Sequence, residues 1–211
     1  MIHFLKFQIL QFLFYKDVVK SSLLSIFTIF IAIGIMQKNH EISNFLPFLL
    51  VILPITTATC HIDKIFYDDY KSGNLEFLLI AYDTGTIIFV KALGLFFSIL
   101  FVIICSIIFS SLFFDIGLSL AIRIISSSIF VTNILTMIIM VIGAIRIYFE
   151  KNNGMLSAII FPFLIPILIL HGLYIDSHDN TYLSIAIGIC MVVTPILWCL
   201  CRSLISEFYN N

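Results

Sequence analysis

Charged side chains are scarce in this chain, which has 11 Lys and Arg and 12 Asp and Glu among 211 residues. Charged residues make up 11% of the sequence and hydrophobic residues 61%, and the mean hydropathy is +1.16. Soluble domains are roughly a quarter charged, so these values exclude that class and indicate a multi-pass membrane protein. The formal net charge of −1 lacks the basic excess that favours nucleic-acid binding, so we expect no nucleic-acid partner.

Motifs for nucleotide and metal chemistry are also missing. No Gly-x-x-x-x-Gly-Lys-Ser/Thr run occurs, so the chain does not bind ATP phosphates in the P-loop manner. The five cysteines form no Cys-x-x-Cys pair, and no His-Glu-x-x-His run is present. We therefore expect no metal site, no disulfide framework and no cofactor bound by this chain. No Asp or Glu lies mid-way along a predicted span, which disfavours an ion-coupled carrier.

Long apolar runs predict an all-α membrane protein with six transmembrane helices, because each run approaches the roughly 20 residues that cross a bilayer. Residues 1–19 mix aromatic and aliphatic side chains with Lys and Gln, which predicts an interfacial amphipathic elbow helix before the first span. We treat 1–211 as a single domain, with a bundle over 20–201 and a short cytoplasmic tail over 202–211. The spans are placed at 20–36, 43–60, 85–112, 117–145, 155–173 and 182–201.

Basic residues predict the orientation of these spans. Nine of the 11 Lys and Arg fall on one side, and Lys38 and Arg123 fall on the other. Cytoplasmic loops carry the basic excess, so both ends of the chain are predicted to be cytoplasmic. This pattern is typical of a bacterial inner membrane protein, and we favour that location over an organellar inner membrane.

Two kinds of polar residue lie inside the predicted spans, and each is expected to have a different role. Lys91, near the inner end of the third span, is expected to extend its ammonium toward water. Ser128, Thr132 and Thr136 share one face of the fourth span, and small hydroxyl residues on one face favour helix–helix packing over a substrate path.

The longest polar interval is His61–Gly85, which is predicted to be cytoplasmic. Apolar residues recur at helical spacing in its first half, which predicts a short helix. Gly73 suits the position after a helix ends, and Asn74 suits the N-cap of a second helix over Leu75–Tyr82. An ordinary solvated loop is the alternative interpretation. The apolar residues at helical spacing are Ile62, Ile65, Phe66 and Tyr70.

Two motifs resemble a known family. The run Phe66-x-Asp68-Asp69-x-x-x-Gly73-x-Leu75-Glu76 resembles the loop between the second and third spans of ABC-2-type permeases. Extended back to Asp63, it is similar to the CcmB family, the permease subunit of the cytochrome c maturation (haem exporter) complex. A second run, Gly154–Pro166, is similar to that family's Gly-rich loop leading into a span with Pro-x-x-x-Pro.

The resemblance implies a half-transporter of the ABC-2 type, with coupling helices at about 61–83. It would act as a homodimer with two P-loop ATPase subunits (CcmA-like), which bind the ATP, and with haem-handling subunits (CcmC-like and CcmD-like). Pro162 and Pro166 would kink or break their helix. The residues expected to couple the chain to the ATPase are Phe66, Asp68, Asp69, Gly73, Leu75 and Glu76.

The implied function is to couple ATP hydrolysis by the partner to haem export, or to release of the haem-loaded chaperone. An ABC-2-type export permease for a lipid, drug or polysaccharide is one alternative, and a non-transporting membrane scaffold is another. Haem, as the implied cargo, draws attention to His40, His171 and His178, which are predicted to lie on the non-cytoplasmic side. Imidazole can ligate haem iron, but histidines are common in loops and at interfaces, and a ligand role here is the minor alternative.

Reporter fusions test the predicted orientation. Fusions after Asn39 and after Asp179 should show exported-side activity, because both positions lie in loops predicted to be outside. A fusion after Lys71 serves as the cytoplasmic control. Cytoplasmic reporter activity at either outer position would contradict the topology.

Overall fold

A computed structural model describes residues 19–28, 42–59, 62–114, 117–148, 153–177 and 179–210, and within these ranges every regular element is a helix. The predicted all-α class is therefore confirmed. The elbow helix predicted over 1–19 falls almost wholly outside the described residues. The helices are Val19–Thr28, α3 (Ile42–Thr59), α4 (Asp63–Lys71), α5 (Asn74–Ala81), α6 (Thr84–Phe114), α7 (Leu118–Tyr148), α8 (Asn153–Ser177) and α9 (Asn180–Asn210).

Three helices are long and apolar enough to cross a membrane, counting only the described part of the chain: α6, α7 and α9. Each has 31 residues, or about 46 Å at roughly 1.5 Å per residue, against a hydrocarbon core of about 30 Å. Of the other three predicted spans, two overlap α3 and α8, and Val19–Thr28 covers the first part of the one predicted over 20–36, whose remainder lies outside the described residues. The multi-pass architecture is thus established, and the number six stays a prediction.

Helix α7 is the centre of the bundle, and it packs against α9, α8, α6 and α4. Its side chains are buried along most of its length, as expected for a helix that is apolar on all sides. Ser128, Thr132 and Thr136 are among the buried residues, so the prediction that this face packs against other helices is confirmed.

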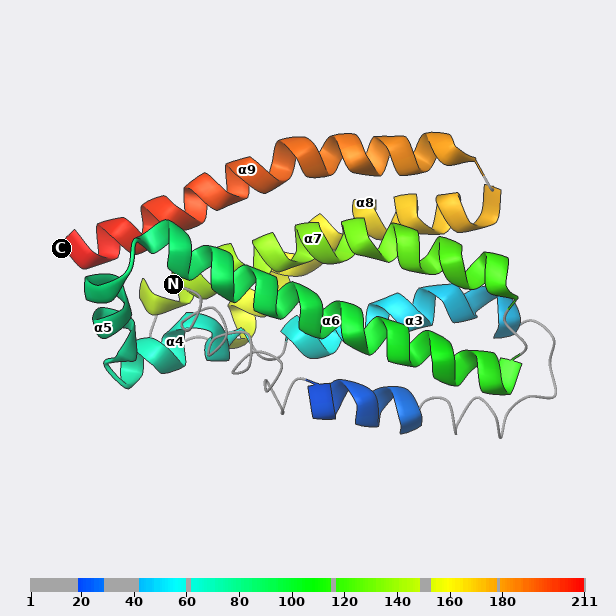
Figure 1. The fold of residues 1–211 in the computed structure, drawn as a ribbon, viewed down its shortest axis with the longest axis horizontal. Coiled ribbons are helices and arrows are strands. Elements are labelled where there is room, and N and C mark those ends of the chain that lie inside the picture. Colours follow the sequence, from blue (N-terminus) through cyan, green and yellow to red (C-terminus); the bar gives the residue numbers. More distant parts are fainter. Residues whose placement is uncertain are drawn as a thin grey trace.

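Helix α9 lies along one edge of the bundle, beside α7 and α8 (Figure 1). The Asn133 side-chain amide donates a hydrogen bond to the Thr194 hydroxyl at 3.2 Å, which ties α9 to α7. At its start, the Thr181 amide and hydroxyl donate to the Asp179 carboxylate, and these hydrogen bonds lower the pKa of Asp179 because they favour its charged form. Most of the tail predicted over 202–211 is helical, because α9 continues to Asn210; its cytoplasmic location stays a prediction.

Helix α8 contains both Pro162 and Pro166 and runs through them without interruption. The helix is therefore not broken at either proline, and a kink there stays a prediction. Each proline removes one backbone donor, and both side chains are exposed.

Helices α4 and α5 lie together at the end of the bundle where the chain's C-terminal turns also lie (Figure 1). We call this end, which carries α4, α5 and the last turns of α9, the α4 end. The exposed pair Arg202–Asp83, with its atoms 3.4 Å apart, joins α9 to the residue before α6 there. Asp83 also accepts a hydrogen bond from the Gly85 amide at 2.9 Å, which caps the start of α6.

Candidate coupling site

Helix α4 forms where the apolar spacing predicted it, and its apolar face is buried. Phe66 has no exposed surface, and Ile65 is 2% exposed. Both side chains lie against Gly143 of α7, where an added Cβ would come within 3.3 Å of Phe66 Cδ2. The missing side chain at Gly143 thus lets α4 approach α7 closely. The first half of the polar stretch is therefore packed into the bundle, and the solvated-loop interpretation fails for it.

A lysine from α6 lies beneath α4. The Lys91 side chain is 2% exposed, and its ammonium donates to the Ile65 carbonyl and to the Asp69 carboxylate. The same ammonium lies 4.9 Å from the centre of the Phe66 ring, within the range of a cation–π interaction. The expectation that Lys91 extends toward water is wrong, because α4 covers it and supplies its counter-charge.

Two further contacts fasten α4 to its neighbours. The Arg146 guanidinium, on α7, lies 4.4 Å from the Tyr67 ring centre. Phe208, near the end of α9, packs edge-on against Tyr70 and Tyr148, with ring centres 5.1 and 5.3 Å apart. Helix α4 is therefore held by one side chain from each of three long helices. We call this set the anchor residues: Lys91, Arg146 and Phe208.

Gly73 separates α4 from α5, as predicted. Its φ is +74°, in the left-handed region, which favours glycine because a Cβ is disfavoured there. An added Cβ at Gly73 would meet nothing within 4 Å, so a substitution would strain the backbone without a clash. Asn74 differs from its predicted role, since it is the first residue of α5 and Gly73 occupies the cap position.

Helix α5 buries little of itself. Leu75 is 1% exposed and holds the helix against the bundle, but Phe77 and Ile80 are 74% and 72% exposed. Helix α5 lies outside the predicted spans, and neighbouring exposed apolar residues there favour an interaction site. Sequence analysis did not single out Phe77 and Ile80. A signal was available, because a short helix that lies outside the predicted spans and has no polar face is expected to be covered by other residues on both sides.

Apart from Gly73 at the turn, the predicted coupling residues divide into two groups. Asp68 and Glu76 are exposed and free to meet a partner. Phe66, Asp69 and Leu75 point into the chain's own contacts, and they position the two helices. The contacts of Lys91 and Arg146 with α4 were not predicted: Lys91 was expected to extend toward water, and Arg146 was only one of the nine basic residues that set the orientation. The available clue to Lys91 was a basic residue two turns inside an apolar helix.

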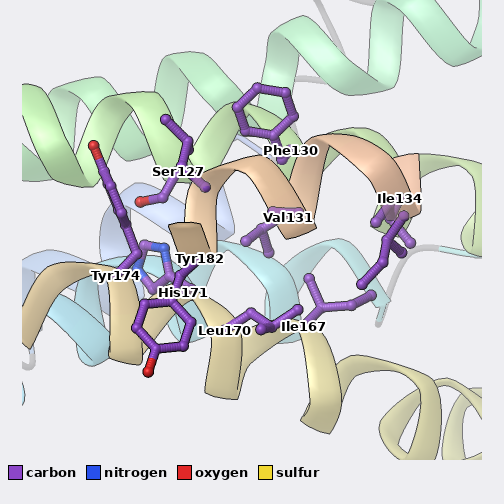
Figure 2. Close-up of a pocket in the computed structure, with 12 residues that line it drawn as sticks. Ser127, Phe130, Val131, Ile134, Ile167, Leu170, His171, Tyr174 and Tyr182 are labelled. Atoms are coloured by element: carbon purple, nitrogen blue, oxygen red, sulfur yellow. The ribbon is translucent and has the colours of Figure 1, made fainter. Parts of the chain in front are cut away.

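Of the three candidate haem ligands, His40 and His178 lie outside the described residues. His171 of α8 is 2% exposed and lines a pocket between α7, α8 and α9. Figure 2 shows it near Ser127, Tyr174 and Tyr182, with aliphatic side chains toward the other end. The cavity measures about 20 Å³, room for roughly one water molecule, and a haem does not fit it in this arrangement.

Metal-ligating side chains do not gather anywhere in the part of the chain that the structure describes: no group of three or more His, Cys, Asp or Glu could hold an ion there.

The fold and the site together define a class: a multi-pass helical membrane protein with a helix pair packed at one end of its bundle.

Comparison with known sequences places the chain within that class. The profile of the CcmB protein family matches residues 13–198, and the chain belongs to this family, the haem exporter B permeases of the cytochrome c maturation system. Such a protein is a multi-pass inner membrane subunit of a transporter and is not itself catalytic.

Two relatives match along most of their length, and both are uncharacterized proteins. The one from Rickettsia prowazekii (strain Madrid E) is 29% identical over 196 residues, which cover 88% of this chain and 87% of the relative. The one from Rickettsia conorii (strain ATCC VR-613 / Malish 7) is 31% identical over 191 residues, which cover 89% and 88%.

The left-handed backbone at Gly73 predicts how substitutions there behave. Gly73→Val should cost about 1–2 kcal/mol locally and tilt α5 away from its place beside α4, while the bundle still inserts. Gly73→Asn should be milder, because Asn tolerates this region better than other residues.

The measurement is the distance between spin labels at Lys71 and Ala81, both exposed, in detergent-solubilised protein whose native cysteines are replaced. We expect a shifted or broadened distribution for Gly73→Val and a near-native one for Gly73→Asn. An unchanged distance distribution for Gly73→Val would show that the turn between α4 and α5 does not depend on glycine.

Proposed function

We propose that this chain couples ATP hydrolysis by a separate P-loop subunit to movement of its own spans in cytochrome c maturation. The product of that movement is haem export or release of the haem-loaded chaperone. The observation that carries the proposal is the contrast between the two helices at the α4 end. Helix α4 is anchored in the bundle, whereas α5 presents Phe77 and Ile80 outward.

Helix α5 is the surface proposed to contact the ATPase. Leaving two large apolar side chains in water costs roughly 25 cal/mol for each Å² of apolar surface, and a partner that covers them recovers that energy. Asp68 and Glu76 lie on exposed parts of the same helix pair, so they supply charges at the rim of the contact. Rim charges affect the rate and specificity of association more than its strength.

The anchor residues transmit the movement of α4 to the long helices. Gly73 sets the angle between the helices, and α4 is fixed to α6 by Lys91, to α7 by Arg146 and to α9 by Phe208. A displacement of α5 by the ATPase therefore reaches α7 and α9 through α4, and it reaches α6 both through α4 and through the short link that follows α5. Two copies of the chain, each with its ATPase, complete the proposed transporter.

The histidine pocket has a different place in this proposal. If haem itself is exported, the cavity beside His171 is far too small to pass it. A haem path through this pocket therefore requires α7, α8 and α9 to separate. Release of a haem-loaded chaperone by a partner subunit requires no such opening.

Substitutions on α5 test the proposed contact. Phe77→Asp together with Ile80→Asp should lower co-purification of the ATPase subunit, since central apolar residues of an interface are worth about 2 kcal/mol or more each, roughly thirtyfold in affinity. Ser203→Asp is the control, because Ser203 is exposed at the same end on α9. Cytochrome c yield and co-purified ATPase are measured for the tagged chain expressed with the partner subunits from its own genome.

We expect the α5 double variant to insert normally, to lose the ATPase and to make little cytochrome c, while Ser203→Asp resembles the wild type. Wild-type amounts of co-purified ATPase with Phe77→Asp and Ile80→Asp would contradict the assignment of this surface. A scaffold without a transport role predicts instead that charge reversal at Asp68 and Asp69 leaves ATP turnover of the assembled complex unchanged.

A further inference from the structure

The interactions that join α4 to α6 centre on one side chain. Helix α4 packs closely along α7, where Ile65 and Phe66 meet Gly143. The connection to α6 is different, because the Lys91 ammonium reaches from α6 to a carbonyl, a carboxylate and an aromatic ring of α4. Three contacts on one ammonium fix both the position and the rotation of α4 relative to α6.

Stability alone is a weak reason for such an arrangement. A buried ion pair loses much of its Coulomb energy to desolvation, and apolar residues of similar volume often give equal or greater stability. The apolar face of α4 is already fully packed on α7, with Phe66 at 0% exposed. Unlike apolar packing, the pair has directional bonds, and these specify one arrangement of α4 relative to α6.

We propose that Lys91 is a positioning residue for energy coupling. Its bond to Asp69 makes α6 follow α4 when the ATPase displaces the helix pair. Without the bond, α4 stays attached to α7 but slides relative to α6, and ATP is hydrolysed without productive movement of the spans. This inference rests on the proposed function, and it assigns Asp69 to an internal contact in place of a contact with the ATPase.

The test removes both charges together. Lys91→Met with Asp69→Asn leaves no unpaired charge under α4, whereas Asp69→Asn alone strands a buried ammonium and should reduce the amount of folded protein. The matched control is Arg202→Met with Asp83→Asn, which removes the exposed pair at the same end of the bundle. Exposed pairs contribute little to stability, and Asn at position 83 retains an N-cap for α6.

Each variant is expressed with its own partner subunits in cells that lack the chromosomal copy. Three quantities are measured: the amount of assembled complex, its ATP turnover, and the cytochrome c made per ATP hydrolysed. For the Lys91–Asp69 double variant we expect wild-type assembly and turnover, with cytochrome c per ATP lowered roughly tenfold, a typical size for coupling between sites. The control pair should leave all three quantities at wild-type values.

Cytochrome c per ATP at the wild-type value in the double variant would overturn the proposal. If the double variant does not assemble, Lys91→Met alone is measured, because Asp69 is 28% exposed and its carboxylate retains contact with water. Failure of that variant to assemble as well would show a purely structural pair and would also overturn the proposal. If the wild-type chain itself supports no cytochrome c maturation, the proposed function fails instead.

Discussion

A lysine ammonium buried inside an apolar bundle requires a counter-charge, and that requirement organises the α4 end of this protein. Lys91 lies in α6, and its carboxylate partner, Asp69, lies on a helix outside the spans. The pair can form only if α4 folds back against the bundle. Gly143 on α7 leaves the space for it to do so. The need of Lys91 for a counter-charge and the absence of a side chain at Gly143 together explain why α4 packs against the bundle.

This packing gives the two short helices unequal roles. Helix α4 is bound to α6, α7 and α9 through Lys91, Arg146 and Phe208, so it belongs mechanically to the spans. Helix α5 is held by few buried residues and leaves Phe77 outward, so it belongs to the surface. The left-handed turn at Gly73 joins the two at a fixed angle. A soluble motor that binds α5 thus acts on the long helices by two routes: through Gly73 and α4, and through the short link from α5 into α6.

Local features of this fold are readable in the sequence, because they depend on nearby residues. Apolar periodicity predicted the first short helix, and the Gly-Asn pair at positions 73 and 74 predicted where it ends and where the second begins. Hydropathy indicates where a predicted span ends, and it does not indicate where the helix ends, which is why α9 continues past Arg202. The Lys91–Asp69 pair was not readable, because 22 positions separate its members. A buried charge pair depends on which helices meet, and one sequence does not specify that.

The most direct test of this account is the structure of the complete complex, with its ATPase subunits, solved without nucleotide and with a trapped ATP analogue. The quantity to compare is the position of α4 relative to the adjoining half of α6. The account predicts that both helices are displaced together and that Lys91 still contacts Asp69 in each state. A displaced α4 beside a stationary α6, with that contact broken, would contradict it.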